Sequence, residues 1–176
     1  MIHPPPPEDA GPIARIYEPF VRNTAVSFET EPPTVEEMGE RISKTMKTYP
    51  WLVAEVEGKV VGYAYASIHR VRTAYQWSVE VSVYIDPEWH RRGIARSLYL
   101  RLFDILRQQG FYNAYAGITL PNPASVGVHE HMGFRRIGVY EGVGHKLGRW
   151  HDVGWWELTL MPRPAVVAPP RPFVDL

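Results

Sequence analysis

A change of hydrophobic period midway along the chain constrains its fold more than any other feature. Apolar residues alternate over Val79–Ile85, which predicts a strand with one apolar face. Asp86-Pro87 ends this strand, because proline has no N–H to donate to a neighbouring strand. A helical apolar stripe follows from about Arg92, formed by Ala95, Leu98, Tyr99, Leu102, Phe103 and Leu106. The sequence therefore predicts a strand, a tight turn and a helix in direct succession.

The turn between strand and helix, residues 91–95, combines small residues with basic ones. Gly93 and Ala95 let the backbone approach a ligand closely, and the N–H groups of the helix's first turn have no partners within the helix. The helix dipole adds about half a positive charge there. Three basic side chains strengthen the field: Arg91, Arg92 and Arg96. Such a turn can serve only to start a helix, but its chemistry also fits a pyrophosphate.

The composition narrows the classes of protein to consider. With 19 basic and 19 acidic residues the chain has no net charge, so no global field attracts it to nucleic acid or to an anionic membrane. It has no run of about 18 apolar residues that would span a bilayer. It has no cysteine for disulfides or thiolate chemistry, and its histidines are too scattered for a metal site. The N-terminus lacks the regions of a signal peptide, so we expect a cytoplasmic protein.

Helical and strand patterns follow one another along the chain. Two helices are expected over residues 8–23 and 34–46, with Pro19 ending or kinking the first. A hairpin over residues 51–68 precedes the strand–turn–helix unit. A strand, a short helix and two more strands complete the pattern, with residues 142–150 as a loop between the last two. This order predicts an α/β fold, a mixed sheet with helices on its faces.

The pattern also divides the chain. Residues 1–161 carry all of the helical and strand periodicity and are expected to form one domain. Residues 162–176 contain five prolines and no core periodicity. We expect them to form an extended or disordered tail that can lie along a neighbouring surface.

Polar residues close to the predicted turn are candidates for chemistry. Glu80 lies on the strand face opposite the apolar residues, where a carboxylate costs free energy unless it is partnered or used. It is either a solvated or ion-paired strand residue, or a general base that deprotonates an ammonium substrate. Arg70 and Arg72 are either a solvated basic edge or a clamp for a carboxylate or phosphinate. Phe28 is either core packing or the aromatic wall of a pocket.

The turn resembles the Arg/Gln-x-x-Gly-x-Gly/Ala loop of the GNAT superfamily of acyl-CoA-dependent N-acyltransferases, with His90 where that pattern has Gln or Arg. The resemblance implies that amides around Gly93 hold the pyrophosphate of acetyl-CoA. It also implies a mostly antiparallel, twisted sheet with helices on both faces and a splayed strand pair that opens the acyl-CoA cleft. The residues implied to bind acetyl-CoA are Val83, Tyr84, Ile85, Arg91, Arg92, Gly93, Ile94, Ala95, Arg96, Asn122 and Ser125.

Two residues of the second informative stretch, residues 121–134, have alternative roles under this resemblance. Asn122 is a good helix N-cap, and its amide could equally bond pantetheine. His129 falls where many GNAT members place a tyrosine that protonates the departing thiolate. A histidine could do the same, or it could orient the substrate.

Seven stretches resemble the phosphinothricin N-acetyltransferases within the superfamily: residues 28–32, 49–55, 74–77, 83–85, 120–122, 129–130 and 148–154. The resemblance implies acetyl transfer from acetyl-CoA to the α-amino group of phosphinothricin, methionine sulfoximine or a related small amino acid, by direct attack in a homodimeric enzyme. Glu80 would be the base, and Arg70, Arg72 and Tyr75 would lie near the substrate's acid groups. Phe28 and Tyr84 would line the pocket.

Two other functions remain open at this point. One is a GNAT enzyme that acetylates another amine, such as a peptide N-terminus, a polyamine or an antibiotic. The pair Arg70 and Arg72 argues against a polycation by repulsion. The other is a non-catalytic acyl-CoA-binding module whose arginines and tryptophans serve a partner protein.

Overall fold

The computed structural model describes residues 1–176. The strands are β1 (Ile2–His3), β2 (Trp51–Val56), β3 (Lys59–Ile68), β4 (Ser78–Ile85), β5 (Asn113–Leu120), β6 (Arg135–Lys146) and β7 (Arg149–Thr159). The α-helices are α1 (Ala10–Asn23), α2 (Val35–Met46), α3 (Ile94–Gln109) and α4 (Pro123–His131). Short 3₁₀ turns occur at η1 (Pro7–Asp9), η2 (Thr73–Tyr75), η3 (Pro87–Trp89) and η4 (Phe173–Asp175).

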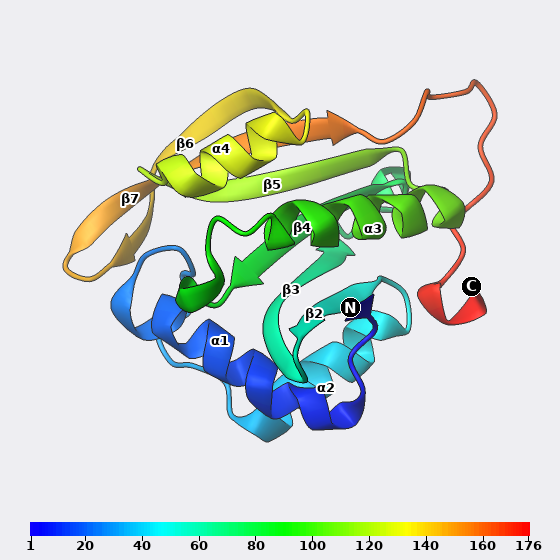
Figure 1. The fold of residues 1–176 in the computed structure, drawn as a ribbon. Helices are drawn as coiled ribbons and strands as arrows, with labels where there is room; N and C mark the ends of the chain where they lie inside the picture. The colour runs from blue at the N-terminus through cyan, green and yellow to red at the C-terminus, as the bar shows by residue number, and fades with distance from the viewer.

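The strands form one open sheet in the order β1-β2-β3-β4-β5-β7-β6 (Figure 1). Every neighbouring pair is antiparallel except β4 and β5, which run parallel. A helix connects β4 to β5, as a parallel pair requires. The predicted α/β fold with a mostly antiparallel sheet is confirmed.

Helices cover both faces of the sheet, as expected. The apolar stripe of α3 packs on one face, and its residues Leu98, Leu102 and Leu106 are fully buried there. Helices α1 and α2 pack on the other face, where Ile13 and Met38 are buried against β2 and β3. Side chains that alternate along the strands thus pack into two separate cores, one on each face of the sheet.

Two local expectations differ from the structure. Helix α1 does not end at Pro19 but continues to Asn23, the end expected from its apolar pattern. Pro19 lies on the exposed side of the helix, where the carbonyl that loses its N–H partner can bond water, while the buried side holds the helix to the sheet. Residues 142–150 are not a loop, because β6 and β7 extend through them and turn only at Leu147-Gly148.

The C-terminal segment, residues 162–176, lies extended past the end of α3 (Figure 1). The buried amide of Gln109 donates from Nε2 to two carbonyl oxygens, Thr48 O and Arg171 O, each at 2.8 Å. The N–H of Arg171 donates to Gln109 O at 2.8 Å. One side chain of α3 therefore joins the C-terminal segment to the loop before β2.

Replacing Gln109 by leucine is expected to destabilise the fold. The variant removes the donor from two carbonyl groups, which costs about 1–3 kcal/mol and lowers Tm by roughly 2–4 °C per kcal/mol in a chain of this size. Thermal unfolding followed by circular dichroism measures the change. Gln108→Leu is the matched control, because the side chain of Gln108 is exposed. Equal Tm values for the two variants would contradict the anchoring role.

Candidate active site

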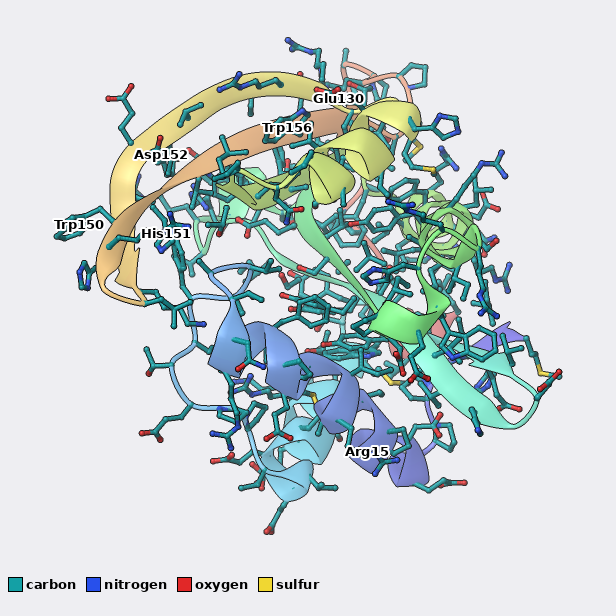
Figure 2. All side chains as sticks on the ribbon, turned by 60° about the vertical axis from the view of Figure 1, so that its left-hand side comes forward. Arg15, Glu130, Trp150, His151, Asp152 and Trp156 are labelled. Atoms are coloured by element: carbon teal, nitrogen blue, oxygen red, sulfur yellow. The ribbon has the colours of Figure 1, made fainter.

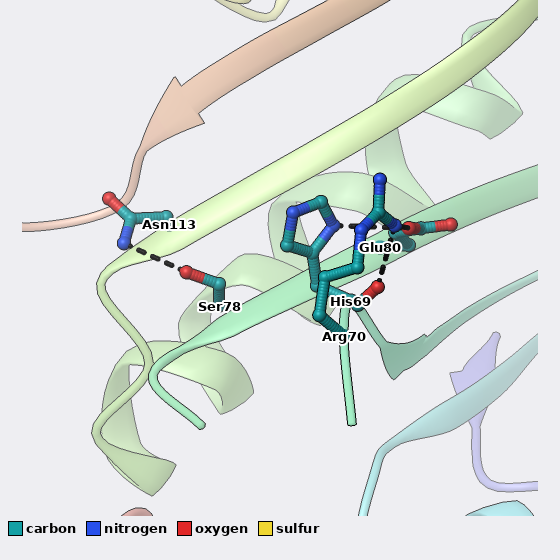
Figure 3. Close-up of polar contacts among 5 residues, drawn as sticks. All are labelled: His69, Arg70, Ser78, Glu80 and Asn113. Carbon is teal, nitrogen blue, oxygen red and sulfur yellow. Dashed lines mark hydrogen bonds and ion pairs between the residues drawn. The ribbon is translucent and has the colours of Figure 1, made fainter. Parts of the chain in front are cut away.

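A gap opens in the sheet between β4 and β5. The two strands pair only through Ser78–Glu80 and Asn113–Tyr115, and they diverge beyond these residues (Figure 1). At the closed end, Asn113 Nδ2 donates to Ser78 Oγ at 3.1 Å (Figure 3). We call the space between residues 81–85 and 116–120 the β4–β5 gap. It corresponds to the splayed strand pair that the resemblance to the GNAT superfamily implies.

The backbone of β4 offers hydrogen-bond donors to this gap. Asp86 N donates to Val61 O of β3 at 3.0 Å, so this N–H points away from β5. Because N–H direction alternates along a strand, the N–H groups of Val83 and Ile85 face the gap. They lie where the pantetheine arm of acetyl-CoA was expected to bind.

The predicted turn leads from β4 into α3 with a left-handed backbone. Gly93 is the N-cap of α3 with φ +75°, and Arg91 has φ +62°. Apart from the adjoining backbone, no heavy atom lies within 4 Å of the position that a Cβ on Gly93 would take. The first amides of α3, including those of Ile94 and Ala95, therefore adjoin open space, as an anion site requires.

The charges around the turn fit the same ligand. Arg91, Arg92 and Arg96 are exposed, and none of them forms an ion pair within the chain. The first turn of α3 contains no acidic residue. The guanidinium of Arg92 lies over the ring of Trp89, 4.5 Å from its centroid, which limits the space it samples. The residues present fit the diphosphate of acetyl-CoA.

Glu80 lies at the closed end of the β4–β5 gap and is ion-paired (Figure 3). His69 Nδ1 lies 3.0 Å from Glu80 Oε1. Arg70 Nη1 donates to the same oxygen at 3.2 Å and to His69 O at 2.8 Å. The other oxygen of the carboxylate, Oε2, has no hydrogen-bond partner in the chain. Glu80 thus combines an anchored oxygen with one that can accept a proton.

Arg72 and Tyr75 lie in the loop between β3 and β4. Both are exposed, and neither forms a hydrogen bond or an ion pair with Glu80. With Arg70 and Arg171 they line a shallow pocket of about 180 Å³ that contains no acidic side chain. The structure thus brings Arg70 to Glu80 and leaves Arg72 and Tyr75 at a neighbouring basic surface.

Phe28 lies in the loop after α1, beside the β6–β7 hairpin. Its ring lies over Gly144, where any side chain would collide with it, and 6.2 Å from the ring of His151. Buried Lys146 holds this loop, because its Nζ donates to Val21 O and Ser27 O at 2.6 Å each. Phe28 remains 39% exposed, so it can contact a ligand.

Tyr84 points from β4 toward α1. Its ring forms edge contacts with Tyr17 at 5.1 Å and Phe20 at 5.3 Å, and it stacks on Tyr63 at 5.3 Å. Burial raises the pKa of the Tyr84 hydroxyl well above its usual value. Tyr84 therefore stays neutral and joins the α1 core to β4.

Asn122 caps α4, with its Oδ1 accepting from Ser125 N at 3.1 Å. Its Nδ2 has no partner in the chain and stays available for a ligand. Helix α4 is tied to β7 by Glu130, whose Oε1 accepts from Trp156 Nε1 at 3.1 Å (Figure 2). The cap and this bond fix α4 beside β5.

His129 is 4% exposed, and both of its ring nitrogens are used within the protein. Nδ1 lies 2.8 Å from Ser125 O, and Nε2 lies 2.9 Å from the hydroxyl of Tyr99. A carbonyl only accepts, so Nδ1 carries the proton and Nε2 accepts from Tyr99. Burial lowers the pKa of His129. His129 is therefore a neutral residue that joins α4 to α3.

The lowered pKa of His129 predicts a pH-dependent stability. In the unfolded chain this histidine takes up a proton below about pH 6.5, whereas the buried ring resists it, so stability falls as pH falls through that value. We expect the Tm of the native protein to drop between pH 7.5 and 5.5 by more than that of His129→Gln. Calorimetry at both pH values checks this, and parallel Tm curves would contradict it.

The remaining histidines do not form a metal site, because no group of three or more potential metal ligands occurs among residues 1–176. His151 points inward from β7, and its Nε2 donates to Lys146 O at 2.9 Å, whereas Trp150 points outward and is 68% exposed (Figure 2). No helix is long and apolar enough to cross a membrane.

His69 is the residue at this site that sequence reasoning missed. Ser67 pairs with Glu80 across β3 and β4, so His69, two residues further on, lies on the same face. Alternation along β3 carries that signal, but only if the register of β3 against β4 is known. A nine-residue loop, 69–77, joins the strands and leaves the register open in the sequence.

Comparison with known proteins identifies the family. A family model described as an acetyltransferase (GNAT) domain matches residues 2–155. Phosphinothricin N-acetyltransferase of Streptomyces viridochromogenes is 39% identical over 171 residues, which cover 97% of this chain and 91% of that protein. L-methionine sulfoximine/L-methionine sulfone acetyltransferase of Salmonella typhimurium is 33% identical over 153 residues, which cover 86% of this chain and 90% of that protein.

A solved structure gives the same result. The phosphinothricin acetyltransferase of Sinorhizobium meliloti, in complex with acetyl-CoA, superposes with a TM-score of 0.89 at 33% identity. The match covers 98% of this chain and 97% of that one. The protein with the β4–β5 gap and the Gly93 turn therefore belongs to the GNAT family of acetyl-CoA-dependent acetyltransferases.

Proposed function

We propose that this enzyme acetylates the α-amino group of a small amino acid of the phosphinothricin, methionine sulfoximine or methionine sulfone type. The observation that supports this most is the position of Glu80 at the closed end of the β4–β5 gap, with Arg70 beside it and one oxygen free. By their names, the relatives from Streptomyces and Salmonella act on these compounds.

In the proposed reaction, Glu80 Oε2 takes a proton from the substrate ammonium group. The freed amine attacks the thioester carbonyl from a near-attack distance of ~3–3.5 Å. The N–H of Val83, which faces the gap, stabilises the developing oxyanion. The C–N bond forms and the C–S bond breaks. The amine nitrogen then gives its second proton to the thiolate sulfur, and coenzyme A leaves as the free thiol. Glu80 returns its proton to solvent.

The binding roles follow from the same placement. We propose that the diphosphate lies on the turn that includes Gly93, with pantetheine along Val83 and Ile85 toward Asn122. Arg70 and Arg72 would bind the acid groups of the amino acid, and arginine offers them two parallel hydrogen bonds. The residues proposed to contact acetyl-CoA or substrate are Phe28, Arg70, Arg72, Tyr75, Val83, Tyr84, Ile85, Arg91, Arg92, Gly93, Ile94, Ala95, Arg96, Asn122 and Ser125.

His129 receives a positioning role in this proposal. A general acid must reach the leaving sulfur with a proton to give, and the Nδ1 proton of His129 is bonded to Ser125 O. We propose that His129 instead fixes α4, and with it the Asn122 cap, beside the pantetheine path.

A homodimer is the proposed assembly, with residues 1–161 as the catalytic domain of each protomer. It is supported by large apolar side chains that the β6–β7 hairpin exposes by 45% to 68%: Ile137, Tyr140, Val143, Leu147 and Trp150. Sedimentation equilibrium would give twice the chain mass of 20.2 kDa.

We propose a cytoplasmic location, where acetyl-CoA is available, and cell fractionation would test it.

A thiol-release assay with acetyl-CoA tests the proposed substrate class. The acceptors are phosphinothricin, methionine sulfoximine, methionine sulfone, the common amino acids, a peptide with a free N-terminus and a polyamine. We expect turnover to be fastest with the first three. Turnover confined to the peptide or the polyamine would contradict the proposal. Binding of coenzyme A without turnover of any amine would indicate an acyl-CoA-binding module.

A further inference from the structure

His69 is the more enclosed of the two side chains that bond Glu80. Its side chain is 13% exposed, compared with 44% for that of Arg70. Both side chains contact the same oxygen, Oε1, with His69 at 3.0 Å and Arg70 at 3.2 Å (Figure 3). The imidazole therefore fixes the carboxylate from within the protein, and the guanidinium does so from solvent.

Aromatic rings from three elements hold the imidazole in place. It stacks on Tyr115 of β5, with ring centroids 4.3 Å apart and planes 15° apart. Tyr75 of η2 and Trp155 of β7 approach with their planes at 74° to it, at 5.9 Å and 6.4 Å. A side chain confined in this way loses little further conformational entropy when it forms a hydrogen bond.

No other group that faces His69 competes with Glu80 as an acceptor for the Nδ1 hydrogen bond. Glu80 is the one carboxylate that forms an ion pair with the imidazole. Arg70 donates to the backbone carbonyl of His69, and the rings of Tyr75 and Tyr115 face the imidazole from η2 and β5. Burial raises the pKa of the Tyr115 hydroxyl, which therefore stays neutral. Nδ1 thus has one strong acceptor within reach, Glu80 Oε1.

Arg70 has a second task that His69 does not have. In the proposed function, Arg70 turns toward the acid group of the amino acid, and its hydrogen bond to Glu80 is then strained or lost. His69 remains, because the three rings confine it. The hydrogen bond from His69 to Oε1 keeps Oε2 directed at the substrate ammonium group.

We infer that His69 is a positioning residue for the proton transfer, which holds Glu80 in the orientation that a base needs while Arg70 binds substrate. The inference rests on the proposed function, because it requires that Glu80 is the base. It assigns His69 no contact with the substrate and no covalent step.

Two substitutions separate the hydrogen bond from the packing. His69→Phe keeps a flat ring on Tyr115 and removes Nδ1. It is expected to lower kcat by about 10–100-fold and to leave the KM for acetyl-CoA unchanged. His69→Asn places an amide N–H near the position of Nδ1 and is expected to recover most of kcat. His131→Phe is the control, because His131 is exposed at the end of α4.

Three outcomes would overturn the inference. His69→Phe with the native kcat would do so while leaving Glu80 as the base. Equal losses in His69→Phe and His69→Asn would make His69 a packing residue only. A further loss of kcat when His69→Phe is added to Glu80→Gln would show that His69 does not act through Glu80. Full activity of Glu80→Gln by itself would instead refute the proposed function.

Discussion

Exchanging Glu80 for glutamine is expected to lower kcat by ~10²–10⁴-fold, the usual contribution of a general base. Glutamine keeps the shape of the side chain, and its carbonyl oxygen can still accept from His69 and Arg70. It cannot take the proton of the ammonium group, so the nucleophilic amine forms only from the small free fraction in solution. Initial rates of thiol release at saturating acetyl-CoA and amino acid measure the change.

Glu55→Gln is the matched control for Glu80→Gln. Glu55 is also a strand carboxylate beside a histidine, since its Oε2 lies 3.3 Å from Nε2 of His3. It lies on β2, away from the β4–β5 gap. We expect native kcat in this variant. A Glu80→Gln enzyme that keeps the native rate at saturation would remove Glu80 from the mechanism.

A valine at Gly93 is expected to weaken the binding of coenzyme A by at least 10–100-fold, since each charge-assisted hydrogen bond it removes contributes about 1.5–3 kcal/mol. The Cβ would stand in the open space in front of the first amides of α3, where the diphosphate is proposed to lie. Its branches would cover those amides. Titration calorimetry with coenzyme A measures Kd directly and needs no amine substrate.

Gly58→Val separates backbone strain from loss of the anion site. Gly58 has φ +76° against +75° for Gly93, and both have open space where a Cβ would stand. Either valine costs about 1–2 kcal/mol of stability in this left-handed region. Gly58 lies in the β2–β3 turn, so its variant is expected to bind coenzyme A normally. Equal Kd values for the two variants would exclude a diphosphate at Gly93.

The strand–turn–helix unit could be read from the sequence because its signals are local. A period of two, a proline stop, a glycine and a period of 3.6 follow one another without help from distant residues. The same local alternation placed Glu80 on the face away from the α3 core. These features account for the turn and one carboxylate of the candidate site, whereas the gap was expected only from the resemblance to the GNAT superfamily.

The other features of the fold and the candidate site depend on contacts between segments that are distant in the sequence. The partner of Glu80 is set by the register of β3 on β4, which the nine residues of the loop 69–77 do not encode. The glycines of residues 142–150 indicated a loop, yet Gly144 is required by the ring of Phe28 that crosses it. The resemblance left His129 as either a general acid or a residue that orients the substrate, and its bond from Nε2 to Tyr99 depends on the packing of α4 against α3.

The three-residue pairing of β4 with β5 means that the sheet contains an edge in its own interior. Strand edges in solution invite a strand from another molecule, and proteins usually cover them. Here the edge lies between two strands that close at one end, so its N–H groups stay available without exposure to other chains. Each backbone hydrogen bond that the sheet forgoes there is worth about 0.5–1.5 kcal/mol. The fold is therefore less stable than a continuous sheet would be, and a ligand that fills the gap is expected to raise its resistance to unfolding.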